Sequence, residues 1–177
     1  NAAGGALTRC VNTGAVTVDK GTGVGGIAGI TSREVTFTQC ANTGHISNDT
    51  TAVLSSGEKP KGGTGGILGV GKSGNVSISL CYNTGTVSGT TIVGGILGGE
   101  AGDYGTSISN GNPSLTVENC YNAGLLDVGS RTNRIGSLVA SPLPDSTVTV
   151  FTSSAAAPVR RRAGSALRAS ASPFWTH

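Results

Sequence analysis

The sequence has few charged or aromatic residues and lacks methionine. Charged residues occupy 12% of its 177 positions and aromatic residues 4%. No acidic residue follows Asp145, whereas four arginines do: Arg160, Arg161, Arg162 and Arg168. The low charge disfavours charge-rich disorder, and no run reaches the roughly 18 apolar residues of a membrane span. We therefore expect a folded domain with no transmembrane segment and no nucleic-acid partner, and, because Asn1 is not a start residue, a piece of a larger polypeptide.

Glycine is the most unusual component that is present. It occupies 30 positions, well above the roughly 7% of typical proteins. The glycines do not follow a collagen-like period, so they indicate turns and close packing of the backbone.

Three short sequence blocks recur along the chain. A Cys-x-Asn-x-Gly block occupies Cys10–Gly14, Cys40–Gly44, Cys81–Gly85 and Cys120–Gly124. A glycine block occupies Gly25–Gly29, Gly65–Gly69 and Gly94–Gly98, with an eroded copy at Gly136–Ala140. An alternating block occupies Val35–Thr38, Val76–Ser79, Leu115–Glu118 and Val148–Phe151. Fixed recurrence of this kind is typical of repeat proteins with one structural unit per repeat.

Each block predicts a short β-strand. Apolar Val35 and Phe37 alternate with threonine, which is the period of a strand, and glycine disfavours helix. We expect an all-β parallel β-solenoid (β-helix) with about three short strands per coil of about 30 residues and four to five coils stacked about 4.8 Å apart. The alternative is an antiparallel β-sandwich.

The repeats divide the chain into two parts. Residues 1–153 carry the solenoid repeats, with loop insertions at about 48–64 and 99–114. Residues 154–177 depart from the pattern and are expected to form a basic Ala/Ser/Arg tail or an irregular C-terminal cap over the last coil. We expect no further coil there, because adjacent arginines would place a charge on the core face of a strand.

Together, the blocks resemble the GLUG-motif repeat of large bacterial secreted and cell-surface proteins, including adhesins. The resemblance is carried by Gly65–Gly69, Gly94–Gly98 and Cys81–Gly85 and covers roughly residues 1–153. It implies a non-catalytic structural or adhesive module, outside the cell, that acts as a spacer or as a stalk presenting a ligand-binding surface. The partners it implies are a host glycan or protein, bound through the insertion loops.

The repeated residues are expected to form columns along the solenoid. A core column consists of Cys10, Cys40, Cys81, Cys120, Ile27, Ile67, Ile96 and Leu138. We interpret the cysteines as free, buried thiols, because stacked side chains keep their Cβ atoms too far apart for a bridge; pairing of Cys10 with Cys40, or of Cys81 with Cys120, is the alternative. Corner turns are expected at Asn12, Gly14, Asn42, Gly44, Asn83, Gly85, Asn122 and Gly124, where glycine permits positive φ and stacked asparagines can form a ladder.

The sequence offers little for catalysis and no cofactor motif. His45 follows Gly44 at a predicted corner and is expected to be solvated. A polysaccharide-binding or polysaccharide-cleaving β-helix is the alternative function, and its candidate residues are Asp19, Lys20, Arg33 and Glu34. Weak calcium candidates in the second insertion are Glu100, Asp103, Asn110 and Asn112.

An outward face rich in threonine and serine gives a further hypothesis, ice binding. Its expected rows are Thr36/Thr38, Ser77/Ser79, Thr116/Glu118 and Thr147/Thr149. Glu118 and the serines interrupt the regularity of that face, so the structural or adhesive role remains the expected function.

Overall fold

A computed structural model describes residues 5–19, 21–49, 62–72, 74–100, 114–129, 134–141, 147–151, 154–155 and 158–161. All the regular elements in these ranges are β-strands. None of the described residues forms a helix that is long and apolar enough to cross a membrane.

The strands form five sheets, which we number by the first strand of each. Sheet 1 contains β1 (Gly5–Thr8), β6 (Val35–Thr38), β11 (Val76–Ser79), β16 (Ser114–Glu118) and β21 (Thr147–Phe151). Sheet 2 contains β2 (Val11–Asn12), β7 (Ala41–Asn42), β12 (Tyr82–Asn83), β17 (Tyr121–Asn122) and β22 (Ser154–Ala155). Sheet 3 contains β3 (Val16–Val18), β8 (Ile46–Asn48), β13 (Val87–Gly89), β18 (Leu126–Val128) and β23 (Val159–Arg161).

The two remaining sheets have four strands each. Sheet 4 contains β4 (Gly23–Gly25), β9 (Gly63–Gly65), β14 (Ile92–Gly94) and β19 (Arg134–Gly136). Sheet 5 contains β5 (Ala28–Thr31), β10 (Leu68–Gly71), β15 (Leu97–Glu100) and β20 (Val139–Ser141). Neighbouring strands within a sheet belong to successive copies of the repeat and pair in parallel, as β6 does with β1 and with β11. The parallel solenoid is therefore confirmed, and the antiparallel sandwich is wrong.

Each complete coil has five strands rather than the expected three. The alternating block and the cysteine block are separated by a sharp corner at a residue with positive φ: Arg9, Gln39, Leu80 and Asn119, with φ between 51° and 56°. A second corner, at the glycine that ends the cysteine block, separates the sheet 2 strand within the block from the sheet 3 strand that follows it. The glycine block folds back on itself and supplies strands to sheets 4 and 5. The described residues therefore form four complete coils and part of a fifth.

The strands also move the boundaries inferred from the repeats. Asn48 ends β8 and Gly63–Gly65 forms β9, so residues at both ends of the expected 48–64 insertion belong to the solenoid. Glu100 and Ser114 likewise lie in β15 and β16. At the C-terminal end, β22 and β23 pair with β17 and β18, and the sheets therefore continue to Arg161, past residue 153.

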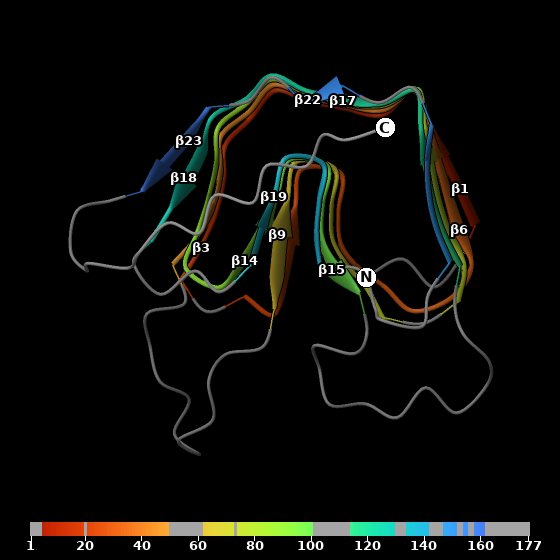
Figure 1. The fold of residues 1–177 in the computed structure, drawn as a ribbon, viewed down its shortest axis with the longest axis horizontal. Coiled ribbons are helices and arrows are strands. Elements are labelled where there is room, and N and C mark those ends of the chain that lie inside the picture. Colours follow the sequence, from red (N-terminus) through yellow and green to blue (C-terminus); the bar gives the residue numbers. More distant parts are fainter. Residues whose placement is uncertain are drawn as a thin grey trace, which may run out of the picture.

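In cross-section, each coil has two lobes joined by sheet 2 (Figure 1). Sheets 1 and 5 enclose one core, which includes Phe37, Ile67, Ile78 and Leu115 at 0% exposure. Sheets 3 and 4 enclose a smaller core that includes Ile46 and the equivalent residues of the next coils. The turns between sheets 4 and 5 point toward sheet 2 in the middle of the coil (Figure 1).

Glycine allows sheets 4 and 5 to lie back to back between the lobes. A Cβ atom added to Gly23 would come within 2.6 Å of the backbone oxygen of Gly29, which lies on the other leg of the same turn. No side chain fits between two backbones at that distance, so the high glycine content of this block reflects backbone-to-backbone packing.

Candidate functional site

The expected carboxylate and basic cluster does not assemble. Asp19 follows β3 in one lobe, whereas Arg33 and Glu34 connect β5 to β6 in the other lobe. Lys20 lies outside the described residues. The coil path therefore separates Asp19 from its proposed partners, and these residues do not form a common site.

A different polar strip runs along the outer face of sheet 3. The strand register aligns Thr17, Ser47, Ser88, Asp127 and Arg160, one from each coil. Ser88 and Asp127 are 2% and 5% exposed despite facing outward from the core. In this strip, polar side chains of neighbouring coils contact one another.

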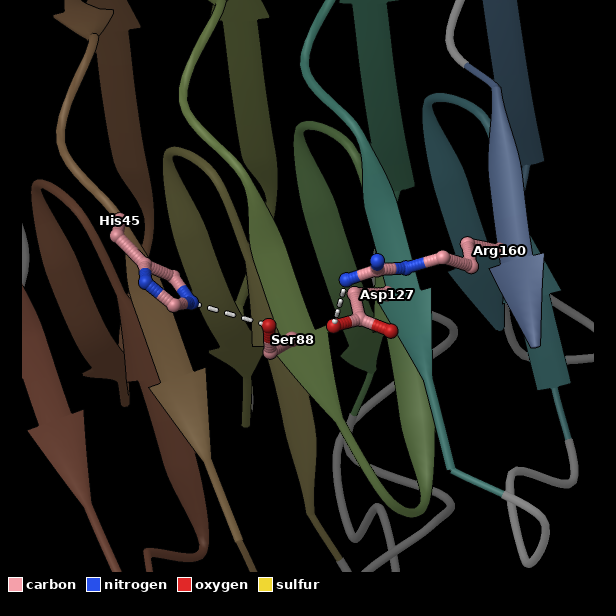
Figure 2. Close-up of polar contacts among 4 residues, drawn as sticks. All are labelled: His45, Ser88, Asp127 and Arg160. Carbon is pink, nitrogen blue, oxygen red and sulfur yellow. Dashed lines mark hydrogen bonds and ion pairs between the residues drawn. The ribbon is translucent and has the colours of Figure 1, made fainter. Parts of the chain in front are cut away.

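Two interactions cross coil boundaries in this strip (Figure 2). His45, which precedes β8, reaches the next coil and places its Nε2 3.0 Å from Ser88 Oγ. Arg160 of the fifth coil donates from Nη2 to Asp127 Oδ2 over 2.9 Å. The Asp127 side chain is 7% exposed and that of Arg160 is 65% exposed, so the guanidinium covers the carboxylate at the surface.

The order of these groups differs from that of a nucleophile–base–carboxylate triad. In a triad, the carboxylate orients the histidine, and the histidine activates the serine. Here Ser88 lies between the imidazole and the carboxylate, and Asp127 is engaged by Arg160 (Figure 2). The contacts join neighbouring coils, and the described residues do not form the carboxylate–histidine–serine order of a triad.

A shallow polar depression adjoins the strip. Its volume is about 60 Å³, and it is lined by Ser47, Asn48, Asp49, Ser88, Gly89, Thr90 and Gly129. Backbone and hydroxyl groups of this kind can accept and donate hydrogen bonds to sugar hydroxyls.

The sequence does predict this strip, but through the spacing of its residues and not through their type. Thr17, Ser47, Ser88 and Asp127 each stand three residues after the glycine of the Cys-x-Asn-x-Gly block. Counting from that glycine gives the register, whereas a search for clustered acids and bases does not. His45, expected to be solvated, is exposed and also hydrogen-bonded to Ser88.

The corner asparagines form a continuous ladder inside the solenoid. Asn12 donates to Asn42, Asn42 to Asn83 and Asn83 to Asn122, each from Nδ2 to Oδ1 over 2.7 Å. Each amide also donates to the backbone oxygen of the glycine two residues later. Asn42, Asn83 and Asn122 are at most 1% exposed.

The glycine of the corner has a different role from the one expected. Among the described glycines, positive φ occurs at Gly5 and Gly74, not at the corner positions Gly14, Gly44, Gly85 and Gly124. A Cβ atom at Gly85 would instead collide with the backbone oxygen of Gly44 in the coil below. The corner therefore needs glycine for close stacking, and positive φ falls on the residue before each cysteine.

The cysteines stack as free thiols beside the larger core. Cys40, Cys81 and Cys120 are buried, whereas Cys10, in the first coil, is half-buried. The backbone N–H of Cys40 donates to Cys81 Sγ over 3.3 Å, and that of Cys81 donates to Cys120 Sγ over 3.4 Å. Burial raises the pKa of the Cys40 thiol, and a side-chain hydrogen bond to Cys120 together with burial raises the pKa of Cys81.

The isoleucine column follows the same stacking. The N–H groups of Ile27, Ile67 and Ile96 donate to the backbone oxygens of Ile67, Ile96 and Leu138 over 2.9–3.0 Å. Ile67 and Ile96 are fully buried, while Ile27 and Leu138, in the first and fourth coils, are partly buried.

The remaining candidates give no site in the described residues. Glu100 lies in β15, and Asp103, Asn110 and Asn112 fall outside the described residues. Within the described ranges, no three His, Cys, Asp or Glu side chains gather in a metal-binding arrangement. On sheet 1, Thr149 pairs with Thr116 and Thr147 with Ser114, so the expected Thr147/Thr149 row is displaced by two residues and Phe151 lies beside Glu118.

No family model matches the chain, and neither a curated protein nor a solved structure shows significant similarity to it.

Proposed function

We propose that the chain is a non-catalytic structural or adhesive repeat module of a bacterial surface or secreted protein. It acts outside the cell as a spacer or as a stalk that presents a ligand-binding surface. The GLUG-like blocks described above are the sequence basis for this assignment.

The observation that carries the proposal is the contrast between inward and outward columns. The inward column of sheet 2 repeats asparagine in four coils, and its amides bond to one another. The outward column of sheet 3 changes from Thr17 to Ser47, Ser88 and Asp127 in the same register. The inward residues that stack the coils thus repeat, whereas the outward residues vary from coil to coil, as expected of a scaffold.

The insertions are suited to partner binding. In the sequence, they fall between β8 and β9 and between β15 and β16. The ends of these strands lie on the side of the coil away from sheet 2 (Figure 1). Loops held at fixed corners of a rigid rod are the usual place for recognition residues. A host glycan or protein is the partner class we assign to them.

Polysaccharide binding at the outer face of sheet 3 is the second candidate. The polar depression beside Ser88, together with exposed His45, favours it, because these groups offer hydrogen bonds to sugar hydroxyls. This candidate uses the strand face, and the first candidate uses the insertions, so variants can separate them.

The test compares three proteins on arrays of glycans and host surface proteins. One is the full chain, one has residues 51–60 and 102–112 each replaced by a short Gly/Ser linker, and one carries Ser88→Ala with His45→Ala. Binding lost only in the loop-replaced protein supports the adhesive module, and binding by none supports the spacer. Binding lost only in the double variant supports the polysaccharide-binding candidate.

Catalysis is tested separately on soluble polysaccharides. Release of reducing or unsaturated ends by the full chain, abolished by Asp127→Asn, would overturn the non-catalytic assignment. Circular dichroism of each variant serves as the folding control.

A further inference from the structure

The first coil exposes an edge that matches the interface between coils. Core positions that are fully buried in the middle coils are only partly buried there: Leu7 lies under Phe37, and Val16 lies under Ile46. Cys10 is half-buried whereas Cys40 is buried. The strand edges of β1 to β5 also present backbone groups that a parallel neighbour would pair.

The asparagine ladder gives this edge a defined polarity. Each amide donates toward the C-terminal coil, so each inner Oδ1 accepts from the coil before it: Asn42 Oδ1 accepts from Asn12 over 2.7 Å. In the described part of the chain, the donor to Asn12 Oδ1 is the Gly14 N–H of its own corner, at 3.3 Å. The edge therefore presents a carbonyl oxygen where the next coil would place an amide donor.

The cysteine column has the same polarity. Cys81 Sγ and Cys120 Sγ each accept from the backbone N–H of the cysteine one coil earlier. In the first coil, Cys10 Sγ donates to the backbone oxygen of Thr8 in its own coil over 3.8 Å. A cysteine-block strand placed ahead of β2 would thus bring its N–H to Cys10 Sγ and its asparagine to Asn12.

A second copy of the chain fits this edge in neither orientation. Head-to-tail stacking would place coil 5 of one copy against the first coil of the other. In coil 5, the residue in register with Asn122 is Ala155, which has no side-chain amide to donate to Asn12. Head-to-head stacking would bring two Asn12 carbonyl oxygens together, and two acceptors do not bond. Asn12 has already committed its Nδ2 to Asn42 Oδ1 and Gly14 O.

We propose that the edge of the first coil is a docking surface for one more parallel coil of the same repeat, joined ahead of Gly5 in the same polypeptide, whose asparagine donates to Asn12 Oδ1. Covalent linkage is assigned because a lone coil cannot bury its apolar face and is unstable until it stacks, and tethering raises its effective concentration. The proposal goes beyond the spacer role by naming what binds one end of the rod. It also gives the rod a direction, since coil 5 lacks the asparagine needed to extend the ladder.

The experiment extends the full chain by one coil. A copy of residues 72–100 followed by a copy of residues 32–34 replaces residues 1–4, so that the added strands enter β1 with the same corner that joins β5 to β6. Cys81 is changed to serine within the added coil, which leaves Cys10 as the one partly exposed thiol of the described residues. The matched control carries Asn83→Ala within the added coil.

Docking predicts that Cys10 reacts with a thiol reagent at least tenfold more slowly in the extended protein than in the original chain. It also predicts a higher urea midpoint for the extended protein than for its Asn83→Ala control. Unchanged Cys10 reactivity, or equal midpoints for the extended protein and its control, would overturn the proposal. A second result would also overturn it: in the original chain, Cys10 becomes more protected as the protein concentration rises, and light scattering gives twice the mass of one chain. A second copy would then occupy the edge.

These outcomes are independent of the proposed function. Glycan or protein binding by the insertion loops does not require an added coil, and the docked coil does not require a ligand.

Discussion

Asn83 connects three successive coils through a single side-chain amide. Its Nδ2 donates to Asn122 Oδ1, and its Oδ1 accepts from Asn42 Nδ2, both over 2.7 Å. The same Nδ2 donates to the backbone oxygen of Gly85 over 2.8 Å. Asn83 is 0% exposed, so solvent does not replace a hydrogen-bond partner that is lost.

Replacing Asn83 with alanine should destabilise the protein strongly. The change leaves the Asn42 amide and the Asn122 carbonyl without their ladder partners, and each buried unsatisfied group costs about 1–3 kcal/mol. We expect a loss of about 2–5 kcal/mol in the free energy of unfolding, measured by urea denaturation. Thr84→Ala, at the exposed neighbouring position, is the control and should change it by less than about 0.5 kcal/mol. A loss below that value for Asn83→Ala would show that the ladder contributes little.

Replacing Thr31 with valine should stabilise the protein. Thr31 is fully buried in β5, and its Oγ1 has no hydrogen-bond partner in the described structure. Valine has nearly the same shape without the hydroxyl, so the penalty of an unpaired buried polar group disappears. We expect a gain of about 1 kcal/mol in urea denaturation. Thr36→Val, on the half-exposed outer face of sheet 1, should be close to neutral, and a Thr31→Val protein that is less stable would indicate that the hydroxyl has a partner.

Replacing Leu80 with asparagine should also stabilise the protein. Leu80 has a φ of 55°, and the residue is 51% exposed, so it contributes little to the core. The left-handed conformation costs most L-residues about 1–2 kcal/mol, and asparagine tolerates it better. Asn119 already occupies the equivalent corner of the next coil. We expect a gain of about 0.5–1 kcal/mol in thermal or urea unfolding, whereas Thr84→Asn, outside the positive-φ corner, should give none.

These corners also show which features a sequence can predict here. The ladder and the core columns were predictable because one residue type recurs in register: asparagine in sheet 2 and isoleucine in the glycine block. The corner before each cysteine was not, since Arg9, Gln39, Leu80 and Asn119 share a backbone conformation but no chemistry. In a solenoid, hydrogen bonds to the neighbouring coils can impose that conformation. The conformational preference of the residue itself does not predict it.

The outer face of sheet 3 was missed for a related reason. Its residues are aligned by the register but differ in type from coil to coil, so they do not appear as a repeat. The strand Val159–Arg161 was not expected, because adjacent arginines seemed to require a buried charge. In the structure, Arg160 faces outward and pairs with Asp127, which supplies the opposite charge one coil below.

The stability of the protein should fall in alkaline solution. Burial raises the pKa of the Cys40 thiol in the folded state above the ordinary value of 9.0. Cys81 and Cys120 share a side-chain hydrogen bond that raises the pKa of Cys81 and lowers that of Cys120, so the contributions of these two thiols oppose each other. The contribution of Cys40 to stability is fully present below about pH 9 and is lost as the pH rises further, because the unfolded chain releases the proton first. We expect the urea midpoint to decline between pH 8 and pH 10.5 and the slope to shrink in a Cys40→Ala variant. An unchanged slope in that variant would assign the decline to other groups.

The hydrogen bonds of the ladder have a consequence for the electrostatics of the rod. Four side-chain amides bond in series and point the same way, so their dipoles add along the axis instead of cancelling as those of alternating strand groups do. Each bond in such a chain polarises the next, by about 10–30% per bond. The interior of the solenoid thus contains an aligned row of dipoles whose electron-rich end is the Asn12 carbonyl, and a rung in the middle, polarised from both sides, holds its neighbours more tightly than a rung at either end.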